Sequence, residues 1–201
     1  YLAELTMAIL ASARRKNPET GYAVDFVGTI ASSLREISAQ GIRVIANAGG
    51  VNPHACAAAL TEAAARQGLH PKIAIVVGDD VMPLIDTLRH EKVTEIQSGK
   101  ELPSNLLTAN AYLGALPIKR ALDLGADIVI TGRCVDSAVT LGALMHEFNW
   151  KEDEYDKLAA GSLAGHIIEC GCQGTCGLHT DWRLVTGWDN MGYPIIEARA
   201  D

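Results

Sequence analysis

The chain has 201 residues, and 48% of them are hydrophobic, which is enough to bury one sizeable core. Its formal net charge of −7 and its isoelectric point near 5.3 argue against a surface for nucleic acid or anionic membrane. No apolar run in the sequence is long enough to span a bilayer. We therefore predict that the binding partner is a small molecule, with no nucleic acid and no membrane involved.

The cysteine content indicates the cellular compartment. Five cysteines are an odd number, and no signal peptide precedes them, so we expect reduced thiols and a cytoplasmic protein. The chain starts at Tyr1 without a methionine, and its first residues read as the middle of an element. We therefore expect the sequence to be a fragment of a longer chain.

Apolar side chains at helical spacing open the chain. This spacing predicts helices over residues 2–13 and 23–39. A strand over residues 42–46 follows and runs into a glycine turn, Asn47-Ala-Gly-Gly-Val-Asn-Pro53. Pro53 suits the first turn of an alanine-rich helix over residues 54–67.

The order of strand, polar turn and helix then recurs three times. The predicted strands cover residues 72–77, 106–112 and 127–130, and their helices cover 81–89, 116–124 and 139–148. The polar turns after these strands are residues 78–80, 110–114 and 131–137. Residues 91–105 are charged and rich in turn formers, which indicates a surface excursion or a lid. A last helix is expected within residues 152–168.

Four such units in succession predict an α/β fold with a mostly parallel sheet and helices on both faces, a Rossmann-like three-layer sandwich. We expect one domain over residues 1–201, incomplete at both ends and part of a larger domain or chain. The glycine- and cysteine-rich segment 169–201 shows no long periodic element, and we expect it to be irregular and to lie against that domain.

The carboxyl ends of parallel strands meet at one sheet edge, so the polar turns are expected to converge there and to form a site. Arg133 has the fork geometry that holds a carboxylate or phosphate. The expected substrate-binding residues are Arg133, Asn47, Asn52, Asn110 and Ser137. The expected acid–base residues are Asp136, Asp79, Asp80 and Glu169. A structural alternative stays open, in which Arg133 and Asp136 pair with each other and Asp136 or Ser137 caps the following helix.

No cofactor motif occurs in the sequence. Because both the G-x-G-x-x-G fingerprint and the phosphate loop are missing, neither NAD nor ATP is predicted and the cofactor is unknown. Asp79 and Asp80 could hold a divalent metal or cap a helix, and the metal is not the favoured interpretation.

The remaining histidines and cysteines also permit two interpretations. Cys170, Cys172 and Cys176 with His179 lack the paired spacing of a zinc knuckle, so we predict neither structural zinc nor a disulfide. His146 is expected to be structural rather than catalytic. His166 and Glu169, three residues apart on one helix, are expected to form a local hydrogen bond rather than a metal or acid–base pair.

Three motifs together resemble the acyclic terpene utilisation (AtuA-type) family: Asn47-Ala-Gly-Gly-Val-Asn-Pro53, Asn110-Ala-Tyr-Leu-Gly-Ala115 and Ile130-Thr-Gly-Arg-Cys-Val-Asp-Ser137. Leu144-Met-His-Glu-Phe148, Ala160-Gly-Ser-Leu-Ala-Gly-His-Ile-Ile-Glu-Cys170 and Gly192-Tyr-Pro-Ile195 fit the family too. The sequence departs at Cys172 and Cys176, where the family leads us to expect glycine or another small residue.

The resemblance implies a catabolic protein for branched isoprenoid or related acyl-CoA intermediates. We therefore expect a cytoplasmic enzyme that acts on a small acid or an acyl-CoA ester, with chemistry of the lyase or hydratase type, and a homo-oligomer. The alternative is a non-catalytic scaffold or binding subunit of a CoA-ester enzyme complex. The resemblance also implies an N-terminal strand and glycine turn before Tyr1 and a continuation after Asp201.

Overall fold

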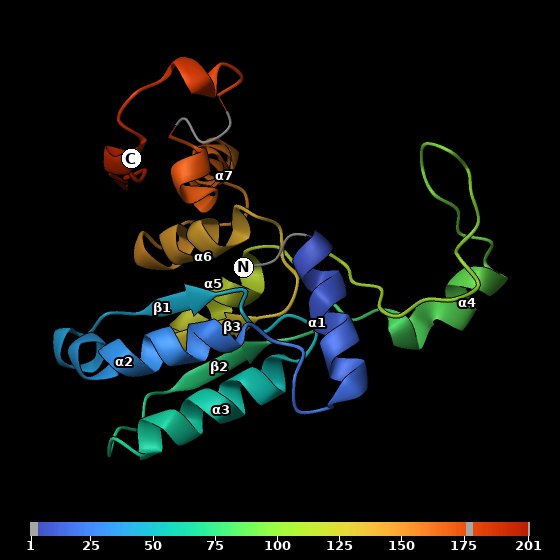
Figure 1. Ribbon diagram of the computed structural model, residues 1–201, viewed down its shortest axis with the longest axis horizontal. Helices are drawn as coiled ribbons and strands as arrows, with labels where there is room; N and C mark the ends of the chain where they lie inside the picture. The colour runs from blue at the N-terminus through green and yellow to red at the C-terminus, as the bar shows by residue number, and fades with distance from the viewer. Residues whose placement is uncertain (1–3, 176–178, 201) are drawn as a thin grey trace. The chain divides into compact units, whose positions relative to one another are not determined.

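A parallel β-sheet of three strands organises the first of two compact units into which the computed structural model divides (Figure 1). The structure describes residues 4–175 and 179–200. The first unit, called here the sheet unit, consists of Tyr1–Leu113 and Leu124–Cys134. The second, the helical unit, consists of Gly114–Asp123 and Val135–Asp201. A single domain over residues 1–201 stays a prediction.

The strands of the sheet unit are β1 (Val44–Ala46), β2 (Ile73–Val76) and β3 (Ile128–Thr131). Their order is β1-β3-β2, and both outer strands run parallel to β3, with Val44 and Ile73 each paired with Ile128. All four residues of β3 are buried, as expected for a β-branched central strand of a parallel sheet. The prediction of an α/β fold with a parallel sheet is confirmed.

Helices α1 (Glu4–Lys16), α2 (Val24–Gln40) and α3 (Pro53–Ala65) belong to the sheet unit. Phe26 and Leu34 of α2 and Leu60 of α3 share a buried core with Ile128 and Ile130 of β3. Helix α1 lies beyond the ends to which the strand arrows point (Figure 1). The chain therefore places a helix over the carboxyl edge of its own sheet.

The predicted strand over residues 106–112 is wrong. This segment is extended but forms only an isolated antiparallel bridge, between Asp80 and Asn110. Leu107 is 48% exposed, and the side chains of Thr108 and Asn110 hydrogen-bond to each other at 2.6 Å. A strand of a parallel sheet is buried on both faces, and this segment has too few buried apolar groups to become one. The described part of the chain contains three strand–turn units where four were predicted.

The next segment of the sheet unit agrees with its prediction. The helix predicted over residues 81–89 forms as a 3-10 turn, η1 (Met82–Leu84), continued by α4 (Ile85–His90). Residues 91–101 are almost entirely exposed and carry an isolated bridge between Thr94 and Glu101. Figure 1 shows α4 and the loop after it extending away from the sheet. The predicted surface excursion is confirmed.

The helical unit is built from α5 (Leu116–Asp123), α6 (Ala138–Glu147) and α7 (Tyr155–Glu169), with α6 against both other helices. Glycines allow this close approach: a Cβ at Gly142 would lie 2.7 Å from Cγ2 of Ile118, and one at Gly165 would lie 2.8 Å from Cα of Ser137. Gly161 and Gly165 therefore weaken helix propensity but fit the packing of α7.

The described residues of the segment after α7 form an irregular stretch. Among its described residues, the regular structure is limited to three short 3-10 turns, η2 (Gly171–Gln173), η3 (Trp182–Leu184) and η4 (Trp188–Asn190). Nε1 of Trp150 donates a hydrogen bond to the carbonyl of Ala200 at 3.2 Å, which fixes the end of this segment within the helical unit. In the described part of the chain, no helix has both the length and the apolar character needed to cross a membrane.

Candidate functional site

The carboxyl ends of the three strands meet at one edge of the sheet unit because β1 and β2 are both parallel to β3. The turn after β1 is held to the end of β3 by a hydrogen bond from the Gly49 amide to the carbonyl of Thr131, at 3.0 Å. The amide of Gly132 donates to the carbonyl of Val76 at the end of β2, at 3.4 Å. The polar turns of β1, β2 and β3 therefore lie side by side.

Asp79 joins two of these turns. Its carboxylate is buried, and Oδ2 accepts hydrogen bonds from the backbone amide of Arg133 at 2.8 Å and from Nδ2 of Asn110 at 2.9 Å. A Cβ at Gly132 would overlap both oxygens of this carboxylate, so glycine is needed for the approach. Asp79 is thus placed to hold the edge in shape, because a buried carboxylate needs such donors.

A cavity of about 230 Å³ opens at this edge. Four of the predicted site residues line it, namely Asn52, Asp79, Asp80 and Asn110. Two cationic or ionisable side chains, Arg14 of α1 and His54 of α3, line it as well. Asp80 is exposed, and its Oδ1 accepts a hydrogen bond from the amide of Met82 at 3.0 Å. Asp80 is therefore the carboxylate in this cavity that solvent and a ligand can reach.

The side chain of Asn52 is occupied by structural contacts. It caps α3, with Oδ1 accepting from the amide of Ala55 at 3.3 Å. Its Nδ2 donates to the carbonyls of Pro18 and Thr20, each at 2.9 Å. These bonds tie the start of α3 to the loop between α1 and α2, which favours a positioning role over the direct ligand contact that we predicted.

Arg133 lies outside the cavity lining and has a buried side chain, 5% exposed. Its guanidinium carbon lies 4.0 Å from the centre of the Tyr112 ring, in cation–π geometry. Nη2 lies 3.3 Å from Oε1 of Glu4, and the same oxygen accepts a hydrogen bond from the Tyr112 hydroxyl at 2.5 Å. The Tyr112 hydrogen bond, a backbone hydrogen bond and the Arg133 charge, in that order, lower the pKa of the Glu4 carboxyl.

A family model described as "Acyclic terpene utilisation family protein AtuA" matches residues 1–201. The chain belongs to the AtuA family. Neither the curated proteins nor the solved structures contain a match to it. Membership in the AtuA family indicates involvement in acyclic terpene utilisation, and the family resemblance expected from the sequence motifs is confirmed.

Three predicted site residues of this AtuA-family chain belong to the helical unit. Asp136 is exposed and lies two residues before the start of α6. Ser137 is buried at the N-cap position of α6 but makes no side-chain capping hydrogen bond, because its backbone already has helical dihedral angles, with φ −75° and ψ −13°. Of the two candidate caps, Asp136 and Ser137, Ser137 therefore does not cap α6 through its side chain.

Glu169 is the last residue of α7, and its Oε1 accepts a hydrogen bond from Sγ of Cys170 at 2.8 Å. This contact raises the pKa of the Cys170 thiol, since the carboxylate stabilises the protonated sulfur. No hydrogen bond joins His166 to Glu169 among the described residues, so the predicted local pair between them is wrong.

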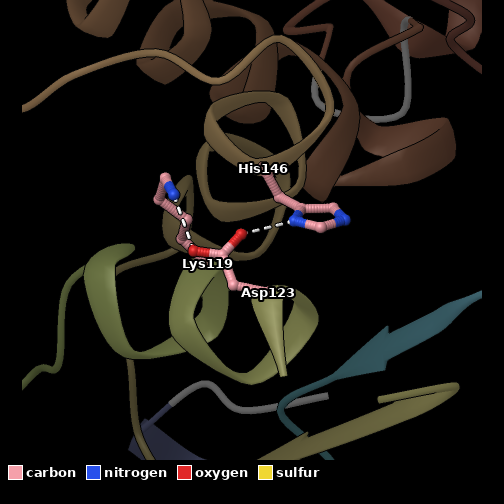
Figure 2. A network of polar contacts seen from close by, with 3 residues as sticks. All are labelled: Lys119, Asp123 and His146. Carbon is pink, nitrogen blue, oxygen red and sulfur yellow. Dashed lines mark hydrogen bonds and ion pairs between the residues drawn. The ribbon is translucent and has the colours of Figure 1, made fainter. Parts of the chain in front are cut away.

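His146 takes part in a polar network of the helical unit (Figure 2). Its Nδ1 lies 2.6 Å from Oδ1 of Asp123, while Nζ of Lys119 donates to Oδ2 of Asp123 at 2.7 Å. The hydrogen bonds from Lys119 and then His146 lower the pKa of Asp123. The network links α5 to α6, in agreement with a structural role for His146.

None of the four described cysteines forms a disulfide; Cys56 and Cys134 are buried, and Cys170 and Cys172 are exposed. Burial raises the pKa of the Cys56 thiol to about 12, so this thiol stays protonated. Cys176 lies outside the described residues, so the predicted absence of zinc and disulfides is not tested there. Over residues 4–175 and 179–200, no three His, Cys, Asp or Glu side chains are grouped to hold a metal ion.

Sequence reasoning missed the partners of the expected site residues. Arg14 and His54 both line the cavity. In the sequence, Arg14 only suggests the end of a helix and His54 the start of one, and neither pattern predicts a cavity-lining residue. Tyr112 was assigned to a strand, and Glu4 lies 129 residues before Arg133. Such long-range contacts leave no periodic signal in one sequence. Asn47, half-buried directly after β1, does not line the cavity.

Proposed function

We propose that this AtuA-family chain is part of a cytoplasmic catabolic enzyme that acts on a small branched acid or its acyl-CoA ester during acyclic terpene breakdown. The proposal rests above all on the cavity at the carboxyl edge of the sheet, which combines an exposed carboxylate, Asp80, with the cationic side chain of Arg14. In open parallel sheets this edge is the usual place for ligands. Family membership supplies the class of metabolite.

The charges of the cavity suit an anionic substrate. His54 lies in the first turn of α3, after Pro53. At this end of a helix the backbone amides and the helix dipole favour negative charge, although Pro53 itself contributes no N–H donor. Asp80 would move a proton to or from the substrate, while Asp79 and Asn110 keep the turns in place. Proton transfer of this kind fits lyase or hydratase chemistry next to a carbonyl.

The test is turnover by the purified protein with 3-methylbutanoate and its CoA ester, followed by mass spectrometry. Loss of a general acid or base typically lowers a rate by about 10²–10⁴-fold, and we expect this for Asp80→Asn. Asp86→Asn, at an exposed aspartate of α4, is the matched control and should keep the wild-type rate. Consumption of neither compound, or an unchanged rate in Asp80→Asn, would refute the proposal.

The second candidate is a non-catalytic scaffold or binding subunit of a CoA-ester enzyme complex. It is favoured by an apolar groove of about 300 Å³ in the helical unit, where Leu163 is 63% exposed and Ile167 is 48% exposed. Exposed apolar surface of this kind is typical of interaction sites. Turnover by the isolated protein would favour the enzyme, whereas binding without turnover would favour the scaffold.

A further inference from the structure

We propose that Arg133 and Tyr112 form a carboxylate-binding site and that the carboxylate of Glu4 occupies it in this structure. The inference rests on the proposed function for the class of ligand, a small branched acid, and it assigns the carboxylate to residues outside the lining of the cavity that contains Asp80. It rests on one oxygen: Oε1 of Glu4 lies 3.3 Å from Nη2 of Arg133 and 2.5 Å from the hydroxyl of Tyr112. Two donors from different segments thus converge on a single carboxylate.

The two donors are held rigidly by the fold. The backbone of Arg133 is fixed on both sides, since its amide donates to Asp79 at 2.8 Å and its carbonyl accepts from the Leu113 amide at 3.3 Å. Leu113 also bridges Cys134 in parallel, which keeps the Tyr112 segment beside the turn after β3. The Tyr112 ring supports the guanidinium from one face at 4.0 Å. A preorganised site of this kind loses little entropy on binding.

The carboxylate, in contrast, is held loosely. The side chain of Arg133 is 5% exposed, whereas that of Glu4 is 77% exposed and extends from the first turn of α1. An ion pair with an exposed partner contributes little to folding, so exchanging that partner costs the protein little. Arg133 and Tyr112 therefore form a fixed binding site, whereas the carboxylate that occupies it can be exchanged.

A substrate carboxylate would therefore compete with Glu4. An internal competitor lowers the apparent affinity for an external ligand by the fraction of time that it occupies the site. The pair selects a carboxylate because a bare carboxylate is the group that it holds here, through one guanidinium and one phenol donor. A free branched acid, rather than the thioester end of its CoA ester, is the substrate form that would fit.

The experiment is titration of the purified protein with 3-methylbutanoate, which requires no turnover. We expect Glu4→Gln to bind it on the order of 3- to 10-fold more tightly than wild type, because the neutral amide is a weaker competitor. Glu36→Gln, at an exposed glutamate of α2, removes the same charge elsewhere and should bind like wild type. Equal affinities for all three proteins would overturn the inference.

Two further variants test the two donor residues, Arg133 and Tyr112. Arg133→Lys keeps the charge but loses the fork, and we expect affinity to fall by about tenfold or more. Tyr112→Phe keeps the ring and loses the hydroxyl, so it should weaken binding even if Arg133→Lys does not fold. Wild-type affinity in Tyr112→Phe contradicts the site, and so does binding of 3-methylbutanamide as tight as that of the acid.

The chemical class is tested by competition. Inorganic phosphate and free CoA should displace 3-methylbutanoate poorly, and equal competition by phosphate would overturn the carboxylate assignment. These binding results do not depend on whether the protein is an enzyme. Binding with the expected variant pattern but no turnover defeats the enzyme and keeps the site, while turnover without dependence on Glu4 or Arg133 does the reverse.

Discussion

At the scale of single residues, the side chains predicted for ligand binding have two different roles. Some join segments at the carboxyl edge of the sheet through hydrogen bonds, and others face the space at that edge. Asp79 and Asn52 are polar and lie at strand and helix ends, as ligand contacts would, but their hydrogen bonds join segments of the sheet unit. Asp80 is exposed at this edge, whereas the side chain of Arg133 is buried against Tyr112 and Glu4. Residue type and position predicted where the edge lies, whereas the division of roles depends on partners distant in sequence.

The structural role of Asn52 gives a prediction. Asn52→Asp keeps the acceptor that caps α3 but loses both donors and places a charge beside the carbonyls of Pro18 and Thr20. We expect a loss of about 1–3 kcal/mol in the free energy of unfolding, measured with chemical denaturant.

Asn105→Asp, in the exposed loop, is the control and should unfold like wild type. If Asn52→Asp is equally stable but binds 3-methylbutanoate poorly, Asn52 contacts the ligand and the positioning role is wrong.

At the scale of elements, the sequence predicted the helices and strands well wherever burial and periodicity agree. Strand β3 illustrates this, since its β-branched residues are all buried. Residues 106–112 show the limit: alternating apolar residues resemble a strand, but the polar side chains of this segment are used to join turns. The contact between α5 and α6 through Asp123 and His146 was equally unpredictable, because 23 residues separate the two side chains.

This contact gives a prediction about pH. The hydrogen bonds of Lys119 and His146 lower the pKa of Asp123 below its ordinary value of 3.8. The unfolded chain therefore binds this proton more readily than the folded one, so the contribution to stability is present above 3.8 and is lost as the pH falls through the lowered value.

Thermal melts across the acid range should show this loss in wild type and a flatter acid limb in Asp123→Asn. Asp153→Asn, at an exposed aspartate of the same unit, should retain the wild-type profile. Identical acid limbs for wild type and Asp123→Asn would show that the network does not stabilise the helical unit.

At the scale of the whole molecule, family membership and the parallel sheet point to the same region. The AtuA-type motifs at residues 47–53, 110–115 and 130–137 include the turn after β1, the Asn110 segment and the turn after β3. The parts of these segments that belong to the sheet unit, residues 47–53, 110–113 and 130–134, lie at one edge of it. The central claim is that this edge, and not the helical unit, binds the ligand.

Hydrogen–deuterium exchange with saturating 3-methylbutanoate tests this claim most directly. Amides that a ligand covers or stabilises exchange more slowly. We predict slower exchange in residues 47–54, 78–82, 108–113 and 131–134, and unchanged exchange in α7. Protection confined to α7 and residues 196–199, or none anywhere while the acid is bound, would contradict the account.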